Sequence, residues 1–85
     1  MAAVIYSRGF LRTAARLPAD ERAAVLRTVA DLEAAEALPL ATDVSTILPP
    51  SLPVWRRPAG ASGRYVYFTV RPDGAVVLVA VGGYL

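Results

Sequence analysis

The chain of 85 residues contains no cysteine and no histidine. Without cysteine it cannot form disulfide bridges, thiolate metal sites or a thiol nucleophile. Without histidine it lacks the usual general base, the commonest metal ligand and any Ser-His-Asp arrangement. We therefore expect no metal site and no cofactor, and any catalysis must depend on arginine, tyrosine, aspartate or glutamate side chains.

Long apolar segments are also missing, although 55% of the residues are hydrophobic and the mean hydropathy is +0.45. The longest apolar run, 75–81, is far shorter than the roughly 20 residues of a membrane-spanning helix. Residues 1–6 do not supply the apolar region and cleavage site of a signal peptide. The sequence therefore predicts a cytoplasmic protein without membrane contact, and its surplus of apolar residues predicts a face that a second chain covers.

Lysine is absent as well, so all nine basic residues are arginine and the net charge is +2. The composition of a GC-rich genome is sufficient to explain this bias. Arginines gathered on one sheet would nevertheless bind phosphate groups, because the planar guanidinium offers parallel donors. The charge is uneven, since residues 19–43 carry six of the seven acids and residues 44–85 carry four arginines and one acid. The C-terminal half is therefore the basic part of the chain.

The N-terminal half predicts a short strand followed by two helices. Residues 2–6 are rich in β-branched and aromatic side chains, and Ser7 can cap a helix that begins directly after it. Pro18 suits the first turn of a second helix over residues 19–37, which Pro39 ends. The tight connection between the helices predicts an αα-hairpin with an apolar face on each helix.

The C-terminal half predicts strands separated by turns. Residues 40–53 contain three prolines, which favour an irregular connection over a central strand. Val54–Arg57 predicts a strand, and in Arg64–Arg71 apolar and polar side chains alternate as in a half-buried strand. Pro72-Asp73-Gly74 predicts a hairpin turn. The following Ala75–Val81 is apolar on both faces, which indicates a central strand.

These elements predict a single α+β domain over residues 1–85. Its order is β-α-α-β-β-β, with a short N-terminal strand, an αα-hairpin and an antiparallel β-meander. We expect the helices to pack on one face of the sheet, and no further element of the sequence is available to cover the other face. That face is therefore expected to be an apolar partner interface, formed by Trp55, Val77, Val79 and Val81.

Several segments occur in an order that is characteristic of a known family. They are Phe10-Leu11-Arg12, Leu17-Pro18, Glu21–Leu26, Gly63–Phe68 and Asp73–Gly82. Together with the predicted elements, they resemble the RelE/ParE superfamily of bacterial type II toxins over nearly the whole chain. The resemblance implies a RelE/ParE-like fold and a cognate antitoxin bound to an exposed apolar surface. It also implies either ribosome-dependent mRNA cleavage, as in RelE-like members, or inhibition of DNA gyrase, as in ParE-like members that lack the nuclease residues.

The resemblance further implies which residues would act in a metal-independent RNA cleavage, which needs a base, an acid and positive charge at the phosphate. Arg56 and Arg57 match the basic residues of the strand before the turn. Arg64 or Tyr65 occupies the place of the family's next arginine, and Tyr84 is the proton-transfer candidate near the C-terminus. This C-terminus departs from the family, because two glycines and Tyr84 stand where basic or histidine residues are usual. A tyrosine with an ordinary pKa of ~10 is a poor base at neutral pH. The sequence therefore leaves two alternatives, an active nuclease and a protein without enzymatic activity.

Two interpretations remain open for the polar side chains of the strands. The candidate target-binding residues are Arg56, Arg57, Arg64, Tyr65, Tyr67 and Arg71. They could contact RNA, the ribosome or gyrase, or they could keep a sheet edge soluble, with Arg64 and Arg71 paired to Asp73 or to an acid of the second helix. The alternative function is a catalytically inactive interaction module that forms a homodimer through its apolar sheet face.

Overall fold

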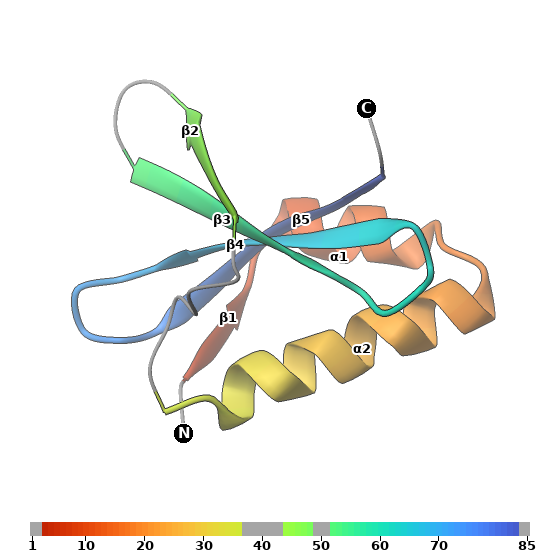
Figure 1. Cartoon of the computed structure of the whole chain (residues 1–85), viewed down its shortest axis with the longest axis horizontal. Helices are drawn as coiled ribbons and strands as arrows, with labels where there is room; N and C mark the ends of the chain where they lie inside the picture. Colours follow the sequence, from red (N-terminus) through yellow and green to blue (C-terminus); the bar gives the residue numbers. More distant parts are fainter. Residues whose placement is uncertain (1–2, 37–43, 49–51, 84–85) are drawn as a thin grey trace.

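The computed structural model describes residues 3–36, 44–48 and 52–83. These residues form a five-stranded sheet and two helices that cover one of its faces (Figure 1). The elements are β1 (Val4–Tyr6), α1 (Arg8–Ala15), α2 (Ala19–Ala34), β2 (Val44–Leu48), β3 (Leu52–Pro58), β4 (Arg64–Val70) and β5 (Val76–Gly83). The strand order is β1-β5-β4-β3-β2, with β1 parallel to β5 and the other neighbours antiparallel. The predicted α+β fold, with its N-terminal strand, helix hairpin and meander, is confirmed.

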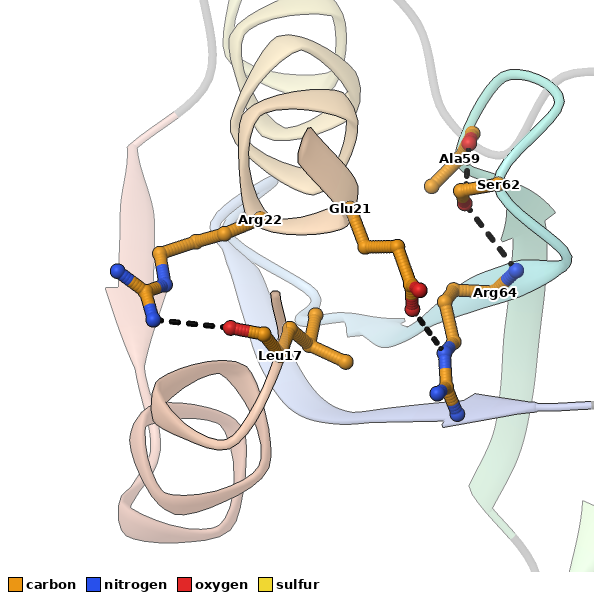
Figure 2. A network of polar contacts seen from close by, with 6 residues as sticks. All are labelled: Leu17, Glu21, Arg22, Ala59, Ser62 and Arg64. Atoms are coloured by element: carbon orange, nitrogen blue, oxygen red, sulfur yellow. Dashed lines mark hydrogen bonds and ion pairs between the residues drawn. The ribbon is translucent and has the colours of Figure 1, made fainter. Parts of the chain in front are cut away.

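Both helices begin where the sequence predicts. The Ser7 hydroxyl caps α1 by accepting a hydrogen bond from the backbone N–H of Phe10 at 3.1 Å. In the connection between the helices, Nη2 of Arg22 donates to the carbonyl oxygen of Leu17 at 2.9 Å (Figure 2). The second helix ends at Ala34, before the predicted end at residue 37, which lies outside the described residues.

The core lies between the helices and the strands β4 and β5. Its largest fully buried side chains are Phe10, Phe68, Leu32, Leu78, Val25, Val66 and Val76. The alternation predicted for β4 is confirmed, because Val66 and Phe68 are buried whereas Tyr65 and Tyr67 are half-buried. The predicted turn is confirmed as well, with Gly74 at a positive φ of 89° that favours glycine.

The segment predicted to be an irregular connection contains a strand instead. β2 pairs with β3 in an antiparallel ladder over Val44–Leu48. Residues 44–48 contain no proline, so nothing prevents them from pairing as a strand. Pro53 lies in the part of β3 that, among the described strands, pairs with β2 alone. The prediction of an irregular connection was therefore wrong. As a result β3 is an internal strand, with β4 on one side and β2 on the other.

β5 contains an irregularity in its pairing with β4. Tyr67 pairs with Ala80 and Phe68 pairs with Leu78, so Val79 is an extra residue on β5. An extra residue of this kind is a β-bulge, which locally reverses the alternation of side chains between the two faces of a strand. The bulge therefore decides which residues of β5 enter the core.

Helix α1 is bonded to β5 at the bulge. The Ser7 hydroxyl donates to the carbonyl oxygen of Val79 at 3.0 Å, and the backbone N–H of Val81 donates to the Thr13 hydroxyl at 2.9 Å. Gly9 faces the same place, where a Cβ atom would lie 2.8 Å from the Val79 carbonyl oxygen. The helix can approach the strand this closely because position 9 has no side chain.

Because of the bulge, one residue that was predicted to lie at the partner interface lies in the core instead. Strict alternation would place Val77, Val79 and Val81 on the same face of the sheet. Val81 instead lies in the core, 8% exposed and paired with Val66. The predicted role of Val81 on an apolar partner face is therefore wrong, whereas Val77 and Val79 remain half-buried.

Candidate functional site

The face of the sheet opposite the helices, called here the open face, carries two rows of side chains that run across the strands. One row consists of Arg56 in β3, Tyr67 in β4 and Ala80 in β5. The other row consists of Thr69 in β4, Val77 in β5 and Ile5 in β1. Five of the six are half-buried, and Ile5 is 39% exposed. The open face is thus cationic and aromatic towards β3 and apolar towards β1.

Arg56 lies against an aromatic ring on the open face. Its guanidinium carbon is 4.8 Å from the centre of the Tyr65 ring, a cation–π distance. The Arg56 Nε atom is buried and has no hydrogen-bond partner within the described part of the chain. Tyr67 lies beside them, with its ring 3.2 Å from the place of a Cβ atom at Gly82. Two aromatic rings and one guanidinium group therefore share this part of the surface.

Arg57 lies on the other face of the sheet, because consecutive residues of a strand point to opposite faces. It pairs with the buried Val66, and its guanidinium carbon is 5.9 Å from the centre of the Phe68 ring. Trp55 is on the same face, paired with Phe68 and packed against the core. The structure thus separates Arg57 from Arg56 and places Trp55 beside the core, away from the open face where the interface was expected.

Arg64, the first residue of β4, reaches the second helix. Its Nε donates to Oε1 of Glu21 at 2.7 Å, and its backbone N–H donates to the Ser62 hydroxyl at 3.2 Å (Figure 2). The Ser62 hydroxyl in turn donates to the carbonyl oxygen of Ala59 at 2.7 Å, which closes the turn between β3 and β4. The alternative interpretation of Arg64, pairing with an acid of the second helix, is confirmed.

Arg71 follows the other end of β4. Its Nη2 donates to Oδ2 of Asp73 at 2.9 Å in an ion pair whose side chains are 51% and 56% exposed. The alternative interpretation of Arg71 is therefore confirmed too. Tyr84 lies outside the described residues, so its proposed role in proton transfer stays a prediction from the sequence.

The sequence-predicted arginines do not form one cluster. Arg56 is on the open face, Arg57 is on the helix face, Arg64 is bonded to α2, and Arg71 is bonded within its own turn. The residue that sequence reasoning missed is Glu21, which stands 43 positions before its partner. Its position in the first turn of a helix is explained by the helix dipole alone, and no local signal in the sequence connects it to Arg64.

Two shallow grooves run between α2 and the turn before β4. Their volumes are about 310 and 370 Å³, and both are lined by Ala24 and Arg27. The grooves are broad surface depressions, and neither is lined by Arg56 or Arg64.

Among the described residues, no helix is long and apolar enough to span a bilayer. Within the same residues, no three acidic, histidine or cysteine side chains gather as metal ligands would.

The chain is similar in structure to chains from two solved complexes. One is in the archaeal RelE–RelB complex from Pyrococcus horikoshii OT3, with a TM-score of 0.71, 16% identity and coverage of 96% of this chain and 93% of that chain. The other is in the RelBE2 toxin–antitoxin complex from Mycobacterium tuberculosis, with a TM-score of 0.72, 19% identity and coverage of 98% of both chains. No family model and no curated protein matches the sequence. At these identities the comparison establishes the fold, which is RelE-like over nearly the whole chain.

Proposed function

We propose that this protein is the toxin of a toxin–antitoxin pair, held inactive by an antitoxin and acting on RNA during translation. The observation that supports the proposal is the fold, which two chains solved in toxin–antitoxin or RelE–RelB complexes share over 96% and 98% of this chain. Fold alone does not determine function. The proposal has two parts, binding of an antitoxin and action on RNA, and the surface chemistry must support each of them separately.

The antitoxin part is supported by the apolar side of the open face. Ile5 is 39% exposed, and beside it Val77 is half-buried in the described structure. A partner segment that covers these side chains would remove apolar surface from water, which is the main source of affinity between proteins. The net charge of +2 and the exposed arginines favour an acidic partner.

The RNA part is supported by the other side of the open face and by Arg64. Bases of single-stranded RNA stack on aromatic rings and on guanidinium planes, which Arg56, Tyr65 and Tyr67 offer together. Arg64 would place positive charge at the phosphate that is cleaved, and Tyr84 would transfer a proton. Arg57 and Arg71 would contribute weaker contacts to the ribosome or the RNA backbone.

The experiment is controlled expression of the chain in bacteria, with and without the product of the neighbouring reading frame, followed by mapping of transcript ends. We expect growth arrest and new mRNA ends that disappear when the antitoxin is present or when Arg64 is replaced by alanine. Absence of both effects would contradict the nuclease proposal. Loss of supercoiling by purified gyrase, without new transcript ends, would instead support a ParE-like target.

A second candidate is a catalytically inactive module that forms a homodimer through the open face. It is favoured by the same apolar residues, Ile5 and Val77, and by the two glycines that stand where the family has basic or histidine residues. Light scattering on the isolated chain distinguishes the two. A well-behaved dimer without RNA cleavage supports the module, whereas insolubility that co-expression of the antitoxin relieves supports the toxin.

A further inference from the structure

Arg64 is held by a helix through one edge of its guanidinium group. Its Nε donates to Oε1 of Glu21 at 2.7 Å, between β4 and α2 (Figure 2). Nη1 and Nη2, called here the Arg64 fork, have no hydrogen-bond partner among the described residues. The Arg64 side chain is 38% exposed. The fork is therefore oriented by the protein and still able to meet a ligand.

The strand next to Arg64 leaves space for the fork. The residue of β5 that pairs with Arg64 is Gly83, where a Cβ atom would lie 3.1 Å from Nη1. A Cβ atom at this position would require the fork to shift by a few tenths of an ångström. Glu21 thus restrains the guanidinium group from the helix side, and Gly83 leaves room for it on the sheet.

The other arginine–carboxylate pair of β4 shows what is particular about this arrangement. Arg71 uses Nη2 to bind Asp73, two residues along the chain. That contact already engages one of the two Nη atoms that would bind a phosphate, whereas the Nε contact of Arg64 leaves both Nη atoms available. The Glu21 carboxylate is also less exposed than that of Asp73, 24% against 56%, so it has less freedom to move away from its arginine.

We infer that Glu21 is a positioning residue, which orients the Arg64 fork towards the anionic oxygens of an RNA backbone. This inference rests on the proposed RNA cleavage. Two parallel N–H donors match a phosphate group, and a guanidinium held before the ligand arrives loses less conformational freedom on binding. Glu21 would not touch RNA itself, and its effect would pass through Arg64 alone.

The test compares the E21A and D20A variants of the full chain in ribosome-dependent mRNA cleavage. Each removes one carboxylate from the first turn of α2, but Asp20 is exposed and does not bond to Arg64. We expect E21A to lower kcat about 10- to 100-fold and to leave KM within about twofold, because a small displacement of a positioned group costs up to about 100-fold in rate. D20A should cleave at the wild-type rate.

Three further variants separate positioning from a general loss of stability. In E21Q an oxygen acceptor for Nε remains, so most of the kcat lost in E21A should return. In G83A the ion pair remains but the fork is displaced, so kcat should fall even when the melting temperature is unchanged. The E21A/R64A double variant should be no slower than R64A, since the two residues act as one unit.

Two results would overturn the inference while the proposed function stands. One is cleavage by folded E21A at the wild-type rate. The other is a decrease of kcat in the E21A/R64A double variant that equals the sum, in free energy, of the decreases in E21A and R64A. A wild-type chain that cleaves no RNA on the ribosome would overturn the proposed function, and the inference would fall with it. The wild-type reaction therefore distinguishes the two failures before any variant is measured.

Discussion

Both faces of the sheet carry apolar side chains, but the two faces differ in what those side chains contact. On the helix face Val66, Phe68 and Leu78 are completely buried. On the open face Tyr67 and Val77, in the same two strands, are half-buried. The helices cover one face and so turn its apolar residues into a core, while the same kind of residue on the other face remains available to a partner. The helix face thus provides the core, and the open face is the one to which we assign partner binding in our proposal.

The sharpest way to test this division is to remove one large side chain from each face. We expect F68A to lower the free energy of unfolding by about 3–5 kcal/mol, the usual cost of removing a buried phenylalanine. Phe68 is 0% exposed and belongs to the core. Since a small domain has roughly 5–15 kcal/mol of stability in total, this variant should be largely unfolded at moderate urea concentrations. Urea denaturation followed by circular dichroism measures the change.

The matched control for F68A is Y67A, in the preceding residue of β4 but on the open face. Tyr67 is half-buried and packs against Gly82, so its removal exposes a smaller buried surface. The loss in Y67A should be less than half that in F68A. Equal losses would mean that the open face is covered as well as the helix face, which would contradict the comparison.

A substitution at the contact between α1 and the bulge should change the stability by a smaller amount. Whether the stability rises or falls tests the contact itself. In an ordinary exposed helix, glycine to alanine stabilises by about 0.5–1 kcal/mol. At Gly9 the new Cβ would lie 2.8 Å from the Val79 carbonyl oxygen, and overpacking costs about 1–3 kcal/mol. We therefore expect G9A to lower the melting temperature. A G9A variant more stable than wild type would show that α1 does not rest on the bulge.

The bulge also explains how much of the fold the sequence could predict. The alternation in Arg64–Val70 identified Val66 and Phe68 as core residues, because local periodicity directly reports which side of a strand is buried. The same rule failed in β5, where one extra residue moved Val81 from the open face to the core. No residue type in an all-apolar run of valine, leucine and alanine signals a bulge, and the hydroxyl groups that bond to β5 there, those of Ser7 and Thr13, lie far away in the sequence.

The candidate site was less predictable for a related reason. The alternation in Arg64–Arg71 predicted that Tyr65 and Tyr67 lie on the same side of their strand, and the structure places Arg56 beside them on the open face. The predicted strand Val54–Arg57 implies that Arg56 and Arg57 lie on opposite faces, since consecutive residues alternate, but only the register of β3 shows which of the two lies on the helix face. The partner of Arg64 was only one of several possible acids, because contacts between distant segments depend on how the helix sits on the sheet.

Binding at the open face should respond to a charge that leaves the fold intact. We expect V77D to weaken binding of the antitoxin about tenfold, equivalent to about 1.4 kcal/mol, because Val77 lies in the apolar row with Ile5. The unfolding transition should stay close to that of the wild type, since Val77 is half-buried and outside the core cluster. Isothermal titration calorimetry with the purified antitoxin measures the affinity.

The control for V77D is L26D, which places the same charge on the outer side of α2, where Leu26 is 52% exposed. Its affinity for the antitoxin should match the wild type. If L26D weakens binding as much as V77D does, the effect is not specific to the open face, which would contradict the assignment of partner binding to that face.

The smallest effect concerns the ion pairs at the two ends of β4. D73N should change the free energy of unfolding by less than about 0.5 kcal/mol, because exposed ion pairs contribute little and the pair with Arg71 is more than half exposed. Asparagine at 73 can still accept the hydrogen bond that Oδ1 receives from the Ala75 N–H. E21Q should cost somewhat more, since Glu21 and Arg64 are less exposed and join a helix to the sheet. Urea denaturation at low and high salt compares the two, and a larger loss in D73N would mean that the turn, rather than α2, holds β4 in place.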